Sequence, residues 1–234
     1  MIIAIDGPSG AGKSTVAKAV ARELGFSCLD TGAMYRAVAW QALQDGVALD
    51  DEEGLTGIAR AYDIDFGHEE GDPTPKRVSI GGVDVTDAIR TEQIDKAVSP
   101  VSAVPGVREA LVLQQRRIGG EGNFVVEGRD IGTTVFPAAE LKVFLTASDE
   151  ERAHRRVRQN VDRGIGSIDY ETVLADIRRR DEHDSSRAAS PLRPADDAVL
   201  LNSTGCYIEG VIEDIRELAR ERMVQRANGG ERSL

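Results

Sequence analysis

The sequence predicts an α/β protein in which a parallel sheet is covered by helices on both faces. Two observations lead to this fold class. Short apolar runs alternate with stretches of helical spacing along the chain, and the first apolar run passes through a glycine-rich loop directly into a helix. At 234 residues and 41% hydrophobic content, the chain can bury one substantial core and one or two small appended lobes. We therefore expect a single compact domain.

The expected strands and helices follow from local patterns. Residues 1–6 form a β-branched apolar run, which indicates a buried strand. Residues 13–24 carry apolar side chains at helical spacing and are followed by Gly25, which is typical of a helix end. Further strands are expected at 26–30, 124–127, 141–145 and 198–201, and further helices at 32–43 and from 208 to about 226. Residues 229–234 are expected to form a disordered tail.

Two stretches interrupt this alternation. Between residues 62 and 86, glycines and prolines, Gly71 among them, punctuate short alternating pieces, which indicates a small β-rich insertion. Residues 151–187 are rich in arginine and have helical spacing around a break at 164–166, so two helices joined by a mobile turn are expected there. The expected division is a core of residues 1–60, 105–150 and 190–228, an insertion at about 61–104, a lid at about 151–189 and the tail.

Charge and cysteine usage limit the partners and the compartment. The net charge is -11, from 29 basic and 40 acidic residues, which argues against a nucleic-acid polymer as partner because such binding needs a broad basic face. Ten arginines nevertheless gather between Arg152 and Arg193, and this cationic zone suits a small, highly charged anion. No apolar run reaches the roughly 18 residues of a membrane span, residues 1–6 lack a signal-peptide pattern, and Cys28 and Cys206 give no disulfide framework. We expect a cytoplasmic protein, and a monomer because no coiled coil or apolar interface is evident.

One motif carries a specific chemical prediction. Residues 7–15 read GPSGAGKST, a glycine followed by four residues and then Gly-Lys-Ser, placed after a predicted strand and opening a predicted helix. In such a phosphate-binding loop (P-loop), glycines let the backbone curl so that amide N–H groups and the helix N-terminus face phosphate oxygens. Lys13 then reaches the β- and γ-phosphates, and the Ser14 hydroxyl holds Mg²⁺. The residues expected to bind the nucleotide are Gly7, Pro8, Ser9, Gly10, Ala11, Gly12, Lys13, Ser14 and Thr15.

A P-loop alone does not name the reaction. GTPases, ATPases and small-molecule kinases share it, but the Asn-Lys dipeptide expected of a guanine-binding motif does not occur in this chain. An arginine-rich lid favours group transfer, because a closed site that excludes water keeps the γ-phosphoryl group from hydrolysis. Single arginines in such helices can equally be solvated surface residues, so the prediction depends on the cluster as a whole.

A set of motifs in fixed order resembles that of the bacterial cytidylate kinases. The segments are DGPSGAGK (6–13), DTGAMYR (30–36), IRT (89–91), VREAL (107–111), GRDIG (128–132), VFP (135–137), ERAHRR (151–156) and RAASPL (187–192). The resemblance runs nearly from end to end of the chain. It implies a three-layer nucleoside monophosphate kinase fold with a five-stranded parallel sheet, a nucleotide-binding insertion and an arginine-rich lid. It further implies Mg²⁺-assisted transfer of the γ-phosphoryl group of ATP to CMP or dCMP.

The resemblance also implies which residues bind the acceptor. Thr31, Tyr35 and Arg36 would line CMP, and Arg36, Arg129 and Arg187 would hold its phosphate. Ser99, Arg108 and Asp130 would face the cytosine, and Arg180 with Asp184 would contact the sugar hydroxyls.

The residues implied in catalysis are Lys13, Arg129, Arg152, Arg156 and Arg187. Of these, the lid arginines Arg152 and Arg156 would lie over the transferring group. The chain departs from the family pattern in two places. Thr31 stands where many members carry serine, which preserves a hydroxyl, and Glu127 stands where an aspartate is frequent.

Elementary electrostatics agrees with phosphoryl transfer between two nucleotides. An acceptor phosphate and a triphosphate repel one another, and arginines with Mg²⁺ supply the counter-charge. Arg129 and Asp130 follow an apolar strand, the position at which open α/β sheets bind ligands. Other interpretations remain for single residues: Tyr35 and Arg36 could be helix surface, Asp30 a helix cap, and Asp184 a surface partner of Arg187.

Two other functions remain compatible with the sequence. One is a P-loop kinase for another small acceptor, such as shikimate, dephospho-coenzyme A or a different nucleoside monophosphate. The other is a regulatory or nucleic-acid-associated ATPase, which the negative net charge disfavours. His68, His154 and His183 lack metal-ligand spacing and are interpreted as ordinary surface or packing residues, and Trp40 as a core residue.

Overall fold

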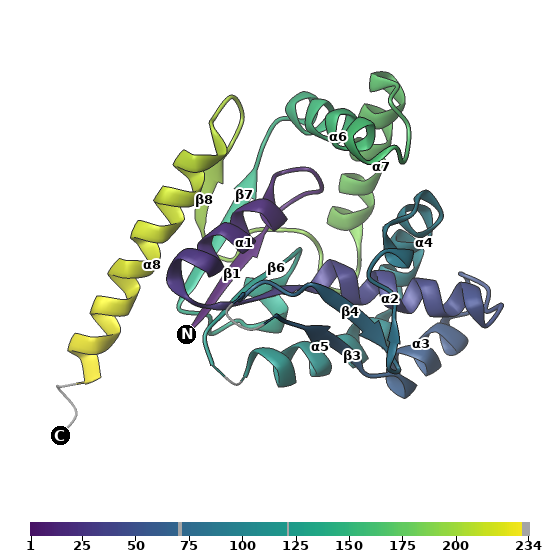
Figure 1. The fold of residues 1–234 in the computed structure, drawn as a ribbon, viewed down its shortest axis with the longest axis horizontal. Helices are drawn as coiled ribbons and strands as arrows, with labels where there is room; N and C mark the ends of the chain where they lie inside the picture. The colour runs from purple at the N-terminus through teal and green to yellow at the C-terminus, as the bar shows by residue number, and fades with distance from the viewer. Residues whose placement is uncertain (70–71, 121, 231–234) are drawn as a thin grey trace.

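A parallel five-stranded sheet forms the centre of the molecule. The structure is a computed structural model and describes residues 1–69, 72–120 and 122–230. The strands are β1 (Ile2–Asp6), β2 (Ser27–Asp30), β6 (Phe124–Gly128), β7 (Leu141–Thr146) and β8 (Val199–Asn202), in the order β2-β6-β1-β7-β8 (Figure 1). The α/β class with a five-stranded parallel sheet is therefore confirmed, and each strand lies within one residue of its expected bounds.

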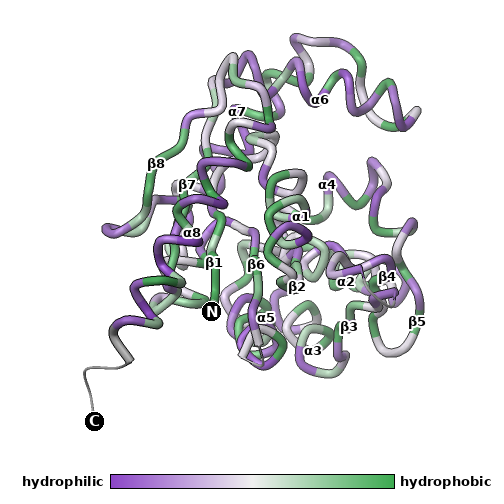
Figure 2. Tube along the Cα trace, turned by 60° about the vertical axis from the view of Figure 1, so that its left-hand side comes forward, coloured by the Kyte–Doolittle hydropathy of each residue, from purple (hydrophilic) through white to green (hydrophobic). Residues whose placement is uncertain are grey.

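Helices cover both faces of this sheet. Alternate residues of each strand point to opposite faces, so Ile3 and Ile5 pack against α1 (Lys13–Leu24) and α8 (Ile208–Gly230). On the other face, Ala4 packs into a larger cluster. That cluster is built with α2 (Thr31–Gln44), α3 (Glu52–Ala61), α4 (Glu92–Ala103) and α5 (Pro105–Gly119). The central strands β1 and β6 are mostly green in Figure 2, the colour of hydrophobic residues.

The strand order places two loops side by side. β1 lies between β6 and β7, with Asp6 opposite Gly128 on one side and Phe144 on the other. Parallel strands end at the same edge of a sheet, and ligands of such sheets bind there. The glycine loop that follows β1 and the Arg129-Asp130 pair that follows β6 are therefore neighbours.

A separate small sheet packs beside the core. It consists of β3 (Ile64–Gly67), β4 (Arg77–Ile80) and β5 (Val83–Asp84), all antiparallel, and its inner face joins the larger cluster through buried Ile64, Val78 and Ile80. The connection between β3 and β4 reaches back to the main sheet, where the carbonyl of Pro73 accepts a hydrogen bond of 3.1 Å from the Cys28 N–H. Gly71 lies outside the described residues.

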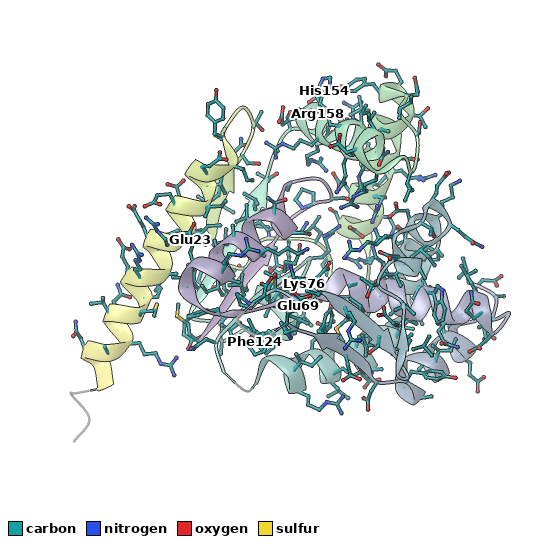
Figure 3. The ribbon with its side chains drawn as sticks, viewed as in Figure 1. Glu23, Glu69, Lys76, Phe124, His154 and Arg158 are labelled. Carbon is teal, nitrogen blue, oxygen red and sulfur yellow. The ribbon has the colours of Figure 1, made fainter. Side chains whose placement is uncertain are left out.

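Two further helices stand above the carboxyl edge of the main sheet (Figure 1). They are α6 (Asp149–Arg163) and α7 (Tyr170–Ser186), and they pack on one another through a small cluster of Ala153, Val173, Leu174 and Ile177. α6 ends at Gly164, whose φ of 63° is left-handed, so the helix ends where the glycines at 164–166 predicted a break between two helices. His154 stacks on the Tyr170 ring between these helices and lies with Arg158 on their outer side (Figure 3). We henceforth call residues 151–189 the lid.

Several elements were not anticipated from the sequence. α3 contains Gly54 and Gly57, and α4 contains Pro100, residues that lower helix propensity. Both helices form nevertheless, because each buries one apolar face. The π-helical turn η2 (Ile131–Val135) was also missed, as was the 3₁₀ turn η1 (Ala88–Arg90).

The last helix is longer than expected. The prediction of a tail from residue 229 is wrong for residues 229 and 230, because α8 extends to Gly230. A glycine costs about 1 kcal/mol relative to alanine in a helix interior, which is too little to end a helix by itself. The rest of the expected tail, residues 231–234, lies outside the described residues.

Candidate active site

The P-loop occupies residues 7–12, between the end of β1 and the start of α1. Its first glycine cannot carry a side chain, because a Cβ on Gly7 would lie 1.9 Å from the Leu145 carbonyl oxygen of β7. Gly12 has a left-handed φ of 96° and opens α1. Ser14 and Thr15 follow in the first turn of the helix and are exposed. The loop thus has the backbone that a phosphate cradle needs.

Lys13 lies folded against this loop. It is buried, and its Nζ donates a hydrogen bond of 2.8 Å to the Pro8 carbonyl oxygen. Burial lowers the pKa of Lys13, and the nearby Arg129 guanidinium lowers it further, whereas Glu127 and Asp6 act in the opposite direction. A phosphate anion beside the ammonium group would favour its charged form.

Arg108 and Asp130 form a buried ion pair on the acceptor side. Arg108 Nη2 lies 2.5 Å from Asp130 Oδ2, and the two side chains are 5% and 6% exposed. The same guanidinium donates to the Ser102 carbonyl oxygen at 3.1 Å, and its carbon lies 5.4 Å from the centroid of the Tyr35 ring. Burial raises the pKa of Tyr35 to about 12, so its hydroxyl stays protonated.

Asp184 joins the end of α7 to the loop after β6. Arg129 Nε donates to Asp184 Oδ2 at 2.9 Å, and Arg187 Nη2 lies 3.6 Å from Asp184 Oδ1. Asp184 is 7% exposed, so the surface interpretation of this residue is wrong. Burial raises the pKa of Asp184, but Arg129 and Arg187 outweigh it and the net shift is downward.

Three more arginines converge on the same region from separate elements. Arg36 of α2 pairs with Asp95 of α4 at 2.5 Å, and Arg156 of α6 donates to the Ser9 hydroxyl at 3.2 Å. Arg180 of α7 has a buried Nε without a hydrogen-bond partner among the described residues. The pKa of Arg180 is lowered to about 10, chiefly by burial and in part by the nearby Arg129, Arg156 and Arg36. Such mutual repulsion between guanidinium groups is relieved by a multivalent anion.

Two of the expected acceptor residues, Thr31 and Ser99, take part in hydrogen bonds with other protein groups. The Thr31 hydroxyl donates to the Glu127 carbonyl oxygen at 2.7 Å and is buried, so it ties the start of α2 to β6. Ser99 is half-buried in α4, where its carbonyl oxygen accepts from the Ser102 hydroxyl at 3.0 Å. The Asp30 carboxylate accepts from the Ala33 N–H and caps α2, as the alternative interpretation of this residue held.

Arg152 is engaged entirely by protein groups. Its Nε donates to the Ala147 carbonyl oxygen and its Nη1 to the Ser9 carbonyl oxygen, each at 3.0 Å. Its Nη2 lies within 2.6 Å of carboxylate oxygens of Asp149 and Asp181. The structure therefore places Arg152 at the P-loop, where it links α6 to the loop backbone.

Sequence reasoning missed four residues of this region. Arg155 donates to the carbonyl oxygens of Ala11 and Ser203; it lies in the ERAHRR segment, but no role of its own was predicted for it. Asp95 pairs with Arg36, and no local pattern marks it. Asp6 and Glu127 carried a signal, since each is a carboxylate at the end of a buried apolar strand. Burial raises the pKa of Glu127, opposed by Lys13 and by a hydrogen bond with Ser14.

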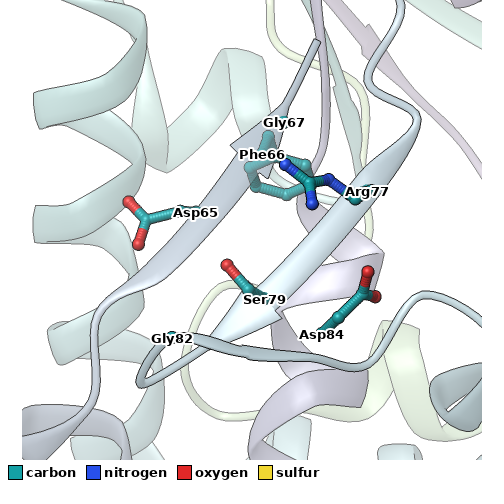
Figure 4. Close-up of a pocket in the computed structure, with 7 residues that line it drawn as sticks. All are labelled: Asp65, Phe66, Gly67, Arg77, Ser79, Gly82 and Asp84. Atoms are coloured by element: carbon teal, nitrogen blue, oxygen red, sulfur yellow. The ribbon is translucent and has the colours of Figure 1, made fainter.

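Two hollows in the described structure lie away from these residues. One of about 250 Å³ opens on the outer face of the small sheet between Asp65, Arg77 and Asp84, where the side chain of Arg77 lies over Gly67 (Figure 4). The other, of about 170 Å³, lies beside Lys142 and Arg193. Within residues 1–69, 72–120 and 122–230, no group of three or more His, Cys, Asp and Glu side chains has a metal-binding arrangement.

The fold and the site together define a P-loop phosphotransferase of the α/β class. A family model described as cytidylate kinase matches residues 3–221, and the chain belongs to this family. A cytidylate kinase of Saccharophagus degradans is 48% identical over 96% of this chain and 99% of its own length. One of Pseudomonas aeruginosa is 50% identical over 92% of this chain and 93% of its own.

A crystal structure of an uncharacterized protein from Eubacterium ventriosum has a TM-score of 0.50 at 13% identity, covering 93% of this chain and 97% of that chain. At this identity the likeness concerns the fold alone.

Proposed function

We propose that the protein transfers the γ-phosphoryl group of ATP to the phosphate of CMP or dCMP, giving ADP and CDP or dCDP. The observation that carries the proposal is the side-by-side placement of two anion sites at the carboxyl edge of the sheet. The P-loop with Lys13 follows β1, and Arg129 with Asp130 follows the neighbouring β6. Two phosphates can be held in line there, so positioning and charge stabilisation supply most of the catalysis.

Each side has residues suited to its substrate. Residues 7–15 would hold the ATP phosphates, while Arg36, Arg129 and Arg187 would hold the phosphate of CMP between Tyr35 and the end of α7. Arg180 and Asp184 would contact the sugar, and Ser99, Arg108 and Asp130 the base. Arg156 already reaches the P-loop at Ser9 and would lie beside the transferring group, with Arg152 supporting the loop from behind.

Magnesium fits the oxygen donors of this site. The Ser14 hydroxyl is exposed at the first turn of α1, and Glu127 beside it has one buried carboxylate oxygen without a hydrogen-bond partner among the described residues. Hydroxyl and carboxylate oxygens are ligands that Mg²⁺ accepts. Ser14 would hold the ion, which supplies counter-charge between the two nucleotides.

We further propose that the protein is cytoplasmic and monomeric and that its partners are small molecules, ATP and CMP or dCMP. Among the described helices, none is both long and apolar enough to cross a membrane. The net charge of -11 disfavours a nucleic-acid polymer as partner.

A panel of acceptors tests the proposal directly. Release of ADP from ATP should be measured with CMP, dCMP, UMP, AMP, GMP, shikimate and dephospho-coenzyme A. We expect CMP and dCMP to give by far the highest kcat/KM. Preference for any other acceptor, or turnover of ATP that RNA or DNA stimulates, would contradict the proposed substrate.

Replacing Asp130 by asparagine is expected to weaken base selection. The Asp130 carboxylate can accept from the N4 amino group of cytosine, whereas uracil presents an oxygen at that position. One mismatched buried polar group costs about 1 to 3 kcal/mol, so the CMP to UMP ratio of kcat/KM should fall on the order of tenfold to a hundredfold in Asp130→Asn. The ratio is measured by steady-state kinetics with both acceptors. A variant that keeps the wild-type ratio would show that Asp130 does not contact the base.

The lid is expected to become ordered when both substrates bind. Asp95 offsets only part of the repulsion among the guanidinium groups of Arg36, Arg156 and Arg180, and phosphates between them would relieve more of it. Amide hydrogen exchange in residues 164–186 should therefore slow markedly with CMP and a non-hydrolysable ATP analogue. α3, which carries none of the proposed site residues, provides the internal control. Equal exchange of the lid with and without nucleotides would contradict this expectation.

A further inference from the structure

Asp6 is a buried carboxylate placed between the two halves of the site. It is the last residue of β1, directly before Gly7 of the P-loop, and is 4% exposed. Its Oδ1 accepts from the Ile131 N–H and its Oδ2 from the Gly132 N–H, each at 2.8 Å. Within the described residues no lysine or arginine lies within ion-pair distance of it. A buried charge without a cation is costly unless N–H groups solvate it, so these two hydrogen bonds are what hold Asp6 in place.

The turn that Asp6 holds carries the acceptor-side residues. η2 begins immediately after Arg129 and Asp130, and the Asp130 carbonyl oxygen accepts from the N–H groups of Thr134 and Val135 at 2.8 and 3.1 Å. The orientation of η2 therefore determines where Asp130 lies. The approach is close, since a Cβ on Gly132 would lie 3.1 Å from the Lys142 side chain and 3.4 Å from Asp6 Oδ2.

Arg116 of α5 holds the same turn at its other end. Its Nε donates to the Val135 carbonyl oxygen at 2.9 Å and its Nη2 to the Thr134 carbonyl oxygen at 2.8 Å. The last carbonyl groups of a helical turn have no partner within the turn, and an arginine is a suitable donor to them. α5 also carries Arg108, the ion-pair partner of Asp130.

We propose that Asp6 and Arg116 are positioning residues that clamp η2 from opposite ends and so fix Arg129 and Asp130 relative to the P-loop. Neither residue needs to contact a nucleotide. Because Asp6 ends β1, the strand that leads into the ATP-binding loop also determines where the acceptor-side residues lie. Burial raises the pKa of Asp6 to about 6, and the two N–H groups oppose that rise by stabilising the ionised form that accepts both bonds.

Arg116→Met, Asp6→Asn and the double variant test this clamp. Methionine keeps the apolar stem of Arg116 and removes its donors, and asparagine keeps the shape of Asp6 and replaces one acceptor by a donor. Arg117→Met is the matched control, because Arg117 is the next residue of α5 and makes an exposed ion pair with Asp63. Each variant is first checked for its melting temperature and circular dichroism.

We expect Arg116→Met to raise the KM for CMP and to lower kcat, on the order of tenfold to a hundredfold in kcat/KM, with the KM for ATP nearly unchanged. Asp6→Asn should have an effect of similar size on the CMP parameters. The double variant should be little worse than the poorer single variant, because either change alone already releases the turn. Hydrogen exchange at residues 131–135 should accelerate in all three variants and stay at the wild-type rate in Arg117→Met.

The kinetic expectations depend on the proposed function, whereas the exchange measurement does not. A wild-type protein that fails to phosphorylate CMP would end the proposed function, and exchange at residues 131–135 would still decide whether the clamp exists. Three results would overturn the clamp: wild-type exchange in a folded Arg116→Met, an effect on ATP rather than on CMP in that variant, or fully additive losses in the double variant. If Asp6→Asn fails to fold, Arg116→Met alone tests the clamp, through its exchange at residues 131–135 and through its effects on the kinetic parameters for CMP and ATP.

Discussion

Lys13→Ala is expected to lower kcat for phosphoryl transfer on the order of a hundredfold to a thousandfold while the protein remains folded. The ammonium group lies against the backbone of the P-loop at Pro8 and would stabilise charge that develops on the β- and γ-phosphates. Because that charge is larger in the transition state than in bound ATP, the loss should fall more on kcat than on the KM for ATP. Initial rates at saturating CMP, over a range of ATP concentrations, measure both constants.

Lys18→Ala provides the control for this variant. Lys18 lies on the same helix outside the P-loop, so its removal should leave turnover near the wild-type value. Thermal unfolding of both variants separates loss of function from loss of fold. Near-normal turnover in a folded Lys13→Ala would contradict the assignment of residues 7–15 as the ATP site.

Arg129→Met is expected to reduce kcat/KM for CMP on the order of a hundredfold to a thousandfold. The change removes a charge-assisted contact to the acceptor phosphate and also leaves Asp184 with only Arg187 as a partner. With only the 3.6 Å pair to Arg187 left to offset its charge, the Asp184 carboxylate would repel the incoming phosphate more strongly. The KM for CMP should therefore rise steeply, and a binding titration with CMP in the absence of ATP measures the same loss without catalysis.

A second substitution distinguishes the two contributions. In Arg129→Met with Asp184→Asn this carboxylate is gone, so part of the CMP affinity should return if repulsion contributes to the loss. Arg193→Met is the control for charge alone, because Arg193 is exposed and its nearest carboxylate, on Asp196, is 3.9 Å away. Equal CMP affinity in Arg129→Met and the wild type would contradict a phosphate-binding role for Arg129.

The parts of the fold that the sequence predicts are those with strong local signals. β1, the glycine loop and α1 follow one another with a β-branched run, a glycine motif and a glycine cap, so their bounds are predicted to within a residue. α3 and α4 were not predicted, because Gly54, Gly57 and Pro100 lower the local preference for helix. Their formation depends on packing against α2 and α5, which is a property of the whole chain.

The same division applies to the site. The P-loop is a contiguous motif, and Arg129-Asp130 could be located because ligands bind where parallel strands end. The partners of these residues could not be found in this way, because Asp95 meets Arg36, and Asp6 meets Ile131, only through the tertiary fold. Nor does the presence of an arginine in a motif show whether it is free for phosphate: Arg156 reaches the site, whereas every nitrogen of Arg152 bonds to protein.

Arg152 and Arg155 donate hydrogen bonds to carbonyl groups of the P-loop, so the N-terminal half of α6 is fixed to that loop. Its first turn moves with the loop that encloses the ATP phosphates, since Ser9 and Ala11 accept hydrogen bonds from these two arginines. Any rearrangement that moves α7 would have to break its ion pairs with the first turn of α6, those of Asp181 with Arg152 and of Arg178 with Asp149 and Glu150. We therefore expect substitutions in the connection at 164–169 to change how fast the lid opens while the bonds from Arg152 and Arg155 to the P-loop stay intact.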